Sequence, residues 1–355
     1  MRLERFSLRL TDPLETANGP IEAREGFLVR LGRGRGDSGD DNSDDSDDDG
    51  ADGPASGLGE ATPLPGWTES LDDCRAALDD GTPDATTPAA RHGVSLARAD
   101  ADARAADERL CDRLAAEGPF DSAEAADAVP VNATVGDGTP RETADATHDA
   151  VEKGFDAVKI KVGAREAAED EQRLRAARDA APDAELRADA NGAWDRETAR
   201  EMLDSVADLG FAYVEQPLPA EDLSGLASLR GRGVGVGVDE SLASHSAREV
   251  LAADAADVLV LKPMALGGPD RALDAARAAR DAGADAVVTT TIDAVVARLG
   301  ALHVAAAVPD VRACGLATGS LLADDLAPDP APVRDGAMAV PEGTGLAGDA
   351  LNSLY

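Results

Sequence analysis

The segment Ala157-Val-Lys-Ile-Lys-Val162 carries the pattern that decides the fold. A short run rich in β-branched residues is followed by a stretch of Ala, Arg, Asp and Glu with helical spacing, and the pair then repeats. The runs of this kind lie at 129–135, 157–162, 185–190, 213–216, 234–239, 258–262, 286–291 and 313–316. Eight such units within roughly 205 residues predict a (β/α)8 barrel. A doubly wound parallel sheet is the alternative, but no Gly-x-Gly-x-x-Gly follows the first run.

The chain outside these repeats has a different pattern of apolar and polar residues. Residues 2–10 and 26–31 alternate apolar and polar side chains, as strands do, and the region after about residue 68 has helical spacing. We therefore predict an α/β protein with three parts, which are an α+β unit over 1–125, the barrel over 128–334, and a tail over 335–355 that returns to the first unit. An insertion at about 33–56, rich in Asp and Gly, is predicted to be disordered.

Composition excludes several classes of partner. The chain has 355 residues, with 69 Asp and Glu against 34 Lys and Arg and a formal charge of −35, which argues against binding to nucleic acid or to an anionic membrane. Three scattered cysteines do not suit a disulfide framework or a zinc site. Since no apolar run is long enough for a signal peptide or a membrane span, we expect a cytoplasmic protein. An acidic surface with four lysines in the whole chain predicts a halophilic, salt-accumulating microbe as its source.

Three carboxylates end three consecutive strand-like runs. Asp189, Glu215 and Asp239 are separated by 26 and 24 residues, about one βα unit each. Because the carboxyl ends of barrel strands share one mouth, we expect these side chains to converge there. Unpaired, they would repel one another and lose their hydration, so the triple predicts a hard divalent cation, Mg²⁺ rather than zinc. Any one of these acids alone would more simply be a helix cap.

Three of the four lysines fall on strands of the same predicted barrel. The period of two places Lys159 and Lys161 opposite the apolar side chains of their run, hence toward the barrel interior, and Lys262 directly follows the sixth run. A solvated edge strand is the commoner explanation of a Lys-x-Lys pattern, but the barrel context favours the inward one. Amines on opposite sides of a cation suit the removal of a proton next to a carboxylate, with Lys159 as a neighbouring charge.

Together these residues resemble the enolase superfamily, in its muconate-cycloisomerase-like branch. Within that branch, the segments at 24–31, 59–66, 289–293 and 315–319 look like those of o-succinylbenzoate synthases. Threonines stand on the seventh run where serines are expected, and the acidic insertion interrupts the N-terminal unit. The resemblance implies a TIM-type (β/α)8 barrel whose mouth is closed by an N-terminal α+β capping domain.

The resemblance also implies a reaction, the Mg²⁺-dependent dehydration of 2-succinyl-6-hydroxy-2,4-cyclohexadiene-1-carboxylate to 2-succinylbenzoate, a menaquinone precursor. Mn²⁺ is a possible substitute for Mg²⁺. Lys161 would remove the proton and assist departure of hydroxide, and Lys262 would stabilise the enediolate as a cation. Asn191, Thr289 and Thr290 are candidate substrate contacts, although helix capping or strand-end hydrogen bonding explains each equally well.

Other functions remain open at this point. The same two lysines would serve an N-acylamino acid racemase, and a muconate-type cycloisomerase fits the same machinery. A dipeptide epimerase is less favoured, because the Asp-x-Asp that such enzymes resemble after the eighth strand is missing from 315–319. A halophilic cation-buffering protein would explain the acidic insertion but not the positions of the lysines.

Overall fold

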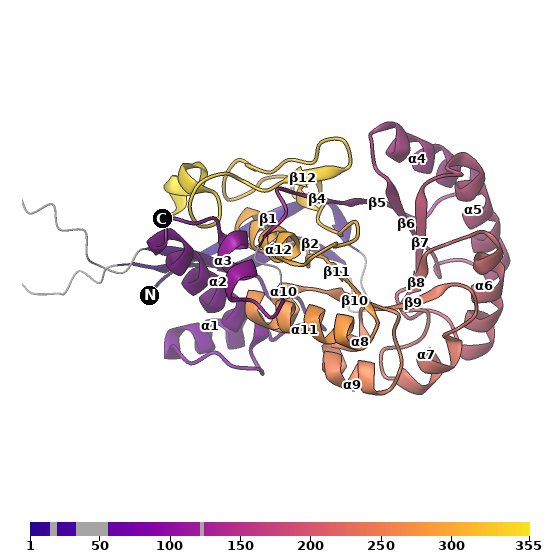
Figure 1. Cartoon of the computed structure of the whole chain (residues 1–355), viewed down its shortest axis with the longest axis horizontal. Helices are drawn as coiled ribbons and strands as arrows, with labels where there is room; N and C mark the ends of the chain where they lie inside the picture. The colour runs from indigo at the N-terminus through magenta and orange to yellow at the C-terminus, as the bar shows by residue number, and fades with distance from the viewer. Residues whose placement is uncertain (15–19, 33–55, 121–123) are drawn as a thin grey trace, which may run out of the picture.

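The computed structural model describes residues 1–14, 20–32, 56–120 and 124–355 (Figure 1). The acidic insertion predicted to be disordered therefore lies almost wholly outside the described residues. Among these residues every helix is too short or too polar to pass through a lipid bilayer.

The N-terminal unit is an antiparallel sheet covered by helices. Its strands, in the spatial order β1-β2-β3, are β1 (Arg2–Leu14), β2 (Ile21–Leu31) and β3 (Gly57–Ala61). Its helices are α1 (Leu71–Asp80), α2 (Pro88–Ala105) and α3 (Leu110–Glu117). Helix α2 lies directly on β3, where a Cβ atom added at Gly57 or Gly59 would come within 1.9 Å of a helix carbonyl oxygen. Glycine is therefore required on β3, because a larger residue would push the helix off the sheet.

The second unit is a parallel sheet in the order β11-β10-β9-β8-β7-β6-β5, with helices α4 to α7 wrapped around its outside on the right of Figure 1. Its strands are β5 (Asn132–Val135), β6 (Ala157–Lys161), β7 (Glu185–Asp189), β8 (Tyr213–Glu215), β9 (Gly235–Val238), β10 (Val258–Leu261) and β11 (Asp285–Val288). Its helices are α4 (Pro140–Glu152), α5 (Ala167–Ala180), α6 (Arg196–Asp208), α7 (Leu223–Leu229), α8 (Ser241–Ser244), α9 (Ala247–Ala252), α10 (Pro263–Leu266), α11 (Pro269–Asp281) and α12 (Val295–Ala307).

The eighth run closes the sheet into a barrel through isolated bridges rather than a regular ladder. Cys314 pairs with Val131 beside β5, and Gly315 pairs with Thr289 beside β11, both in parallel. A Cβ atom added at Gly315 would lie 2.5 Å from Oγ1 of Thr289, so this close approach requires glycine. The predicted (β/α)8 TIM-type barrel with an α+β capping unit is thus confirmed, with an eighth run that pairs through isolated bridges only.

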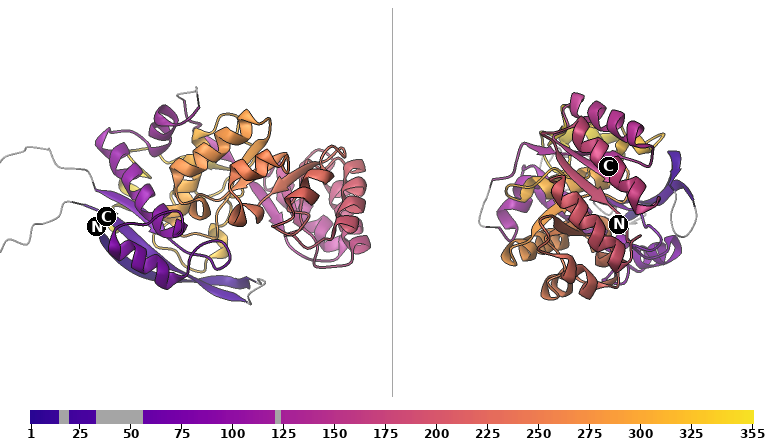
Figure 2. Two further views of the ribbon diagram at one scale, coloured as in Figure 1. Left: turned by 90° about the horizontal axis from the view of Figure 1, so that it is seen from below. Right: turned by 90° about the vertical axis from the view of Figure 1, so that its right-hand side faces the viewer.

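The end of the chain returns along the capping elements. Strand β12 (Ala337–Ala339) pairs antiparallel with β4 (Ala128–Pro130), and two 3-10 helices complete the elements at Gly319–Leu321 and Gly348–Leu354. The hydroxyl of Tyr355 donates to Asp100 on α2 at 2.6 Å. Figure 2 shows both termini on the same side of the molecule. The exact division at 1–125, 128–334 and 335–355 stays a prediction.

A buried glutamate joins the capping sheet to the barrel. Glu60 on β3 accepts hydrogen bonds from the backbone N–H groups of Ala294 and Ala297, at 2.9 and 2.8 Å, and so caps the start of α12. Burial, reinforced by the nearby Asp293 carboxylate, raises the pKa of Glu60 to about 7. The first turn of a barrel helix is therefore held by a side chain of the other unit.

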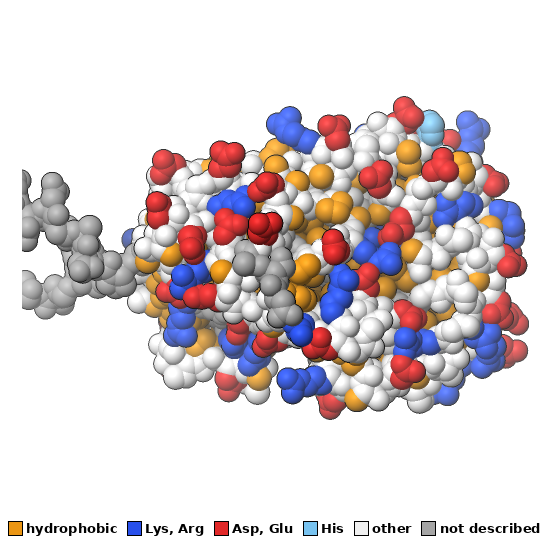
Figure 3. Space-filling view, in the orientation of Figure 1, with side chains coloured by type: hydrophobic (Ala, Val, Ile, Leu, Met, Phe, Trp, Pro, Cys, Tyr) orange, Lys and Arg blue, Asp and Glu red, His pale blue; other side chains and the backbone are white. Residues whose placement is uncertain are grey.

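Charges of both signs are interspersed over the face seen in Figure 3. Several pair along helices, such as Arg75 with Asp79 and Arg277 with Asp281, one helical turn apart. Each such exposed pair contributes little to the stability by itself. The predicted halophilic origin stays a prediction.

Candidate active site

The carboxyl ends of the barrel strands bring the predicted acids and lysines together. Asp189, Glu215 and Asp239 follow one another around the sheet on β7, on β8 and just after β9, with exposed fractions of 0, 1 and 4 %. Three buried carboxylates at one level of a barrel need positive charge close by. The lysines of β6 and of the end of β10 supply it.

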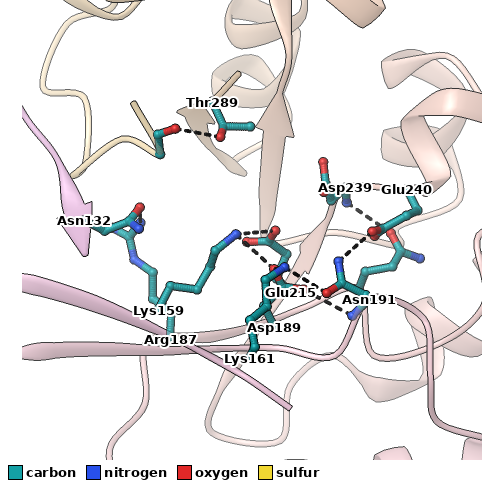
Figure 4. Close-up of polar contacts among 12 residues, drawn as sticks. Asn132, Lys159, Lys161, Arg187, Asp189, Asn191, Glu215, Asp239, Glu240 and Thr289 are labelled. Atoms are coloured by element: carbon teal, nitrogen blue, oxygen red, sulfur yellow. Dashed lines mark hydrogen bonds and ion pairs between the residues drawn. The ribbon is translucent and has the colours of Figure 1, made fainter. Parts of the chain in front are cut away.

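Both lysines of β6 bind the same carboxylate oxygen (Figure 4). The Nζ atom of Lys161 lies 2.6 Å from Oδ2 of Asp189, and that of Lys159 lies 3.0 Å from the same atom. Lys159 also donates to Oε1 of Glu215 at 2.9 Å. The side chain of Lys161 is 37 % exposed and that of Lys159 is 15 % exposed, so Lys161 is the more open to a substrate in the barrel mouth.

Lys262 occupies a more enclosed position between the third carboxylate and the capping unit. Its Nζ atom donates to both carboxylate oxygens of Asp239 at 2.6 Å. On its other side it lies 3.4 Å from the centre of the Trp67 ring. Its side chain is only 11 % exposed. The arrangement keeps this ammonium group paired and fixed.

A tight turn of the capping unit projects Trp67 to that place. In Leu64-Pro65-Gly66-Trp67, the N–H of Trp67 donates to the carbonyl oxygen of Leu64 at 3.0 Å, and Gly66 has a φ of 88°. Proline followed by glycine at positive φ is the signature of a type II turn. The sequence itself therefore fixes where the indole emerges.

Gln216 anchors the backbone of the third carboxylate. Its Oε1 atom accepts from the N–H groups of Asp239 and Ser241 at 3.0 and 3.1 Å, and its Nε2 atom donates to the carbonyl oxygen of Leu218. Gln216 and Asn191 have positive φ values of 38° and 45°, which are uncommon for residues other than glycine. Such conformations gather at functional sites, where the surrounding contacts hold them.

Burial and pairing push the pKa values of the three acids apart. Burial, together with the charge of Asp189, raises the pKa of Glu215 to about 7, and burial raises that of Asp239 to about 6 despite the nearby Lys262. Burial would also raise the pKa of Asp189, but Lys159 and Lys161 hold it below its ordinary value. Lys159 has a pKa raised above its ordinary value, since the attraction of these acids outweighs its burial.

The donor set suits a hard divalent cation, although the acids are not already arranged around one. Among the described residues, no group of three or more His, Cys, Asp or Glu side chains is placed so that it could hold a metal ion. Lysine nitrogens occupy the hydrogen-bonding positions of the three carboxylates instead. Glu240 adds a fourth acid, whose Oε2 atom is buried with no hydrogen-bond partner among the residues that the structure describes. Four acids and three lysines give the cluster a formal net charge of −1. Oxygen ligands with an excess of negative charge fit Mg²⁺.

The three predicted substrate contacts have different surroundings. Asn191 lies within the cluster and accepts from Nζ of Lys161 at 2.8 Å. The hydroxyl of Thr289 donates to the carbonyl oxygen of Gly315 at 2.9 Å, and that of Thr290 lies 2.9 Å from the hydroxyl of Thr318. The two threonine hydroxyls thus make strand-end hydrogen bonds across the barrel closure, and a substrate contact for them stays a prediction.

Sequence reasoning missed Trp67, Gln216 and Glu240. Trp67 is one of two tryptophans and follows a Pro-Gly turn, which is a usable signal for a projecting side chain. Glu240 directly follows Asp239, and Gln216 directly follows Glu215. Nothing in their spacing distinguishes them from helix-starting residues.

A protein-family model described as "Enolase C-terminal domain-like" matches residues 142–350, more than half of the chain. The chain belongs to this enolase family. The matched region contains all the lysines and carboxylates of the site, so the superfamily resemblance predicted from the sequence is confirmed.

Curated relatives of this enolase-family chain include two o-succinylbenzoate synthases. It is 40 % identical over 210 residues to that of Thermobifida fusca and 37 % identical over 222 residues to that of Mycolicibacterium smegmatis. A chloromuconate cycloisomerase of Cupriavidus necator is 32 % identical over 226 residues. These matches cover 58, 60 and 62 % of this chain and 64, 65 and 61 % of the relatives, which is less than two thirds of their length.

Solved structures of the same fold cover nearly the whole chain. A dipeptide epimerase from Methylococcus capsulatus, complexed with Mg and the dipeptide L-Arg-D-Lys, has a TM-score of 0.79 at 26 % identity, with 98 % of both chains covered. An N-succinyl Arg/Lys racemase from Bacillus cereus has a TM-score of 0.81 at 21 % identity, with 99 and 96 % covered. At the latter identity the likeness concerns the fold alone.

Proposed function

We propose that this enolase-family protein is an o-succinylbenzoate synthase. It would convert 2-succinyl-6-hydroxy-2,4-cyclohexadiene-1-carboxylate to 2-succinylbenzoate and water, a step in menaquinone synthesis. The observation that carries the proposal is the unequal exposure of its two lysines, one open and one enclosed, in a chain 40 and 37 % identical to two such synthases over part of its length.

The two lysines take different roles in this reaction. Lys161, the more exposed amine, removes the proton next to the ring carboxylate as general base. The carbon–oxygen bond at the neighbouring ring carbon then breaks, and the same amine returns its proton so that hydroxide leaves as water. Lys262, enclosed between Asp239 and Trp67, stays cationic and balances the negative charge that develops on the substrate.

The cation is proposed to be Mg²⁺, with Mn²⁺ as a substitute. Asp189, Glu215 and Asp239 would hold it, and the lysines now bound to them would turn toward substrate. When bound, Mg²⁺ supplies Lewis-acid charge for the substrate carboxylate. The Methylococcus relative, crystallised with Mg, supports this choice. The cytoplasm remains our proposed location, in keeping with three cysteines that are all free and buried.

A direct assay tests the function. The purified protein in high salt with Mg²⁺ should form 2-succinylbenzoate from its precursor, as followed by mass spectrometry. Lys161→Arg should abolish turnover, because guanidinium does not act as a base at neutral pH. No product from the folded wild-type protein would exclude the synthase.

A racemase of N-acylamino acids is the second candidate, because Lys161 and Lys262 come from strands on opposite sides of the barrel. Proton exchange in deuterated water separates the two. A dedicated synthase should incorporate little α-deuterium into N-succinyl amino acids of either hand. Rapid exchange from both hands, lost for one hand in Lys161→Ala and for the other in Lys262→Ala, would establish the racemase instead. A cycloisomerase would be revealed by turnover of muconate.

A further inference from the structure

Glu240 is connected to Lys161 through a single side chain. The Nδ2 atom of Asn191 donates to Oε1 of Glu240 at 2.8 Å, and its Oδ1 atom accepts from Nζ of Lys161 at 2.8 Å. Figure 4 shows Glu240 and Lys161 on either side of Asn191. The three groups form a chain from the segment after β9 to the lysine at the end of β6.

The two ends of an amide are not equivalent, so the hydrogen bonds from Glu240 through Asn191 to Lys161 can form with only one orientation of the amide. The Nδ2 group only donates and Oδ1 only accepts. With a carboxylate on one side, the amide must turn its oxygen toward the lysine. The reversed amide would point N–H groups at an ammonium group and an oxygen at a carboxylate, which loses both hydrogen bonds. The backbone N–H of Asn191 also donates to Asp189 at 3.1 Å, so the residue has little freedom to adjust.

Helix capping does not explain the position of Glu240. It precedes the short helix α8 but makes no side-chain capping hydrogen bond to it. Its second oxygen, Oε2, is buried and has no hydrogen-bond partner within the described part of the chain. A buried carboxylate oxygen without a partner costs free energy. The hydrogen bond between Glu240 and Asn191 is therefore the contact that accounts for a glutamate at this position.

We propose that Glu240 is a positioning residue, which acts through Asn191 to aim the amine of Lys161. This inference rests on the proposed function for the role of Lys161 as base. Removal of a residue that hydrogen-bonds and orients a functional side chain typically lowers activity by about 10- to 100-fold. The expected effect is mainly on kcat, because Glu240 acts on the base through Asn191.

The first experiment compares variants of Glu240 in the full chain. Glu240→Ala should lower kcat about tenfold or more with KM nearly unchanged, whereas Glu240→Gln, which keeps an acceptor for Asn191, should recover most of the activity. Glu221→Ala is the matched control, since it removes one exposed acid that follows β8. In a double-mutant cycle, Asn191→Ala should abolish the effect of Glu240→Ala. Additive losses, or an unchanged kcat, would refute the positioning role.

A second measurement does not depend on turnover. Because the chain has only four lysines, acetylation of each amine can be followed by peptide mass spectrometry, with the exposed Lys153 as internal reference. Glu240→Ala should speed modification of Lys161 about threefold, the equivalent of one net hydrogen bond. If the wild-type protein makes no 2-succinylbenzoate, the proposed synthase function is wrong. The rate of Lys161 acetylation still tests whether Glu240 positions that amine. An unchanged rate of acetylation would mean that Glu240 does not position Lys161. Weaker Mn²⁺ binding by Glu240→Ala in an electron paramagnetic resonance titration would instead identify Glu240 as a metal ligand and overturn the positioning role.

Discussion

The Nζ atom of Lys262 lies 3.4 Å from the centre of the Trp67 ring, while the same nitrogen lies 2.6 Å from both carboxylate oxygens of Asp239. One residue of the capping unit therefore touches a proposed catalytic lysine of the barrel. An aromatic face attracts a cation by about 0.5–2 kcal/mol, more when water is excluded. The contacts with Trp67 and Asp239 together hold the Lys262 amine in place.

Replacing Trp67 should lower kcat/KM more when the new side chain has no aromatic ring than when it has one. We expect Trp67→Leu to lower kcat/KM about tenfold, the equivalent of roughly 1.4 kcal/mol, and Trp67→Phe to lower it less. Since the chain has two tryptophans, a Trp194→Phe background leaves Trp67 as the sole reporter, and Lys262→Met should then change its fluorescence. Equal activity in the Leu and Phe variants would argue against a cation–π role.

Removing the charge of Asp239 should eliminate metal binding without unfolding the barrel. Asp239→Asn keeps the size of the side chain and its acceptor oxygen but leaves the cation one ligand charge short. We expect no measurable turnover and no saturable Mn²⁺ binding, with circular dichroism in high salt unchanged. Turnover that survives in this variant, or in wild-type protein after exhaustive EDTA treatment, would rule out the metal assignment.

The buried Glu60 should make stability fall as the pH rises through neutrality. Burial, together with Asp293, raises the pKa of Glu60 from 4.5 to about 7, so the folded protein binds this proton more tightly than the unfolded chain does. The resulting stabilisation is complete below about pH 4.5 and is lost as the pH passes about 7. Between pH 5 and 8, the unfolding free energy of wild-type protein should therefore fall more steeply than that of Glu60→Gln, by about 1–3 kcal/mol.

Denaturant unfolding at several pH values measures this difference. The control is Glu22→Gln, which replaces an exposed glutamate on β2 of the same sheet. The site acids Glu215 and Asp239 titrate in the same range but remain in every variant, so they cancel in the comparison. Parallel curves for wild-type and Glu60→Gln would contradict the prediction.

The acidic insertion should be dispensable for chemistry. Nine of the residues from Asp37 to Asp52 are Asp, and the segment lacks the apolar side chains that bury a core. Its deletion should leave kcat within a few-fold and mainly shift the salt concentration of maximal activity. A loss of about a hundredfold, assayed over a range of KCl concentrations, would show that the segment belongs to the active site.

The barrel and its central acids were predictable because they depend on local rules. Alternation of strand and helix signals gives the βα repeat, and the carboxyl ends of parallel strands share one mouth. Asp189, Glu215 and Asp239 could therefore be placed together from spacing alone. The pairing of Lys159 and Lys161 with one oxygen of Asp189 follows from the same register, since β6 and β7 are neighbours.

The remaining features depend on approaches between distant segments. Trp67 meets Lys262 only once the capping unit is docked, and Glu60 reaches α12 across the same boundary. The ring of Tyr213 packs so closely on β9 that a Cβ atom added at Gly237 would lie 2.9 Å from it. Propensity and periodicity contain no information on such contacts.

The eighth run, 313–316, is joined to the barrel less regularly than the strands β5 to β11 are joined to one another. Single bridges join 313–316 to its neighbours, and the buried Arg187 of β7 reaches across the lumen to donate to the carbonyl oxygen of Ala313 at 2.7 Å. Regular ladders protect backbone amides through many mutually supporting bonds, whereas isolated bridges open locally. In hydrogen exchange, the amides of 313–316 should therefore lose protection before those of β6 to β8. The hydrogen bond from the guanidinium of Arg187 to Ala313 should slow this local opening.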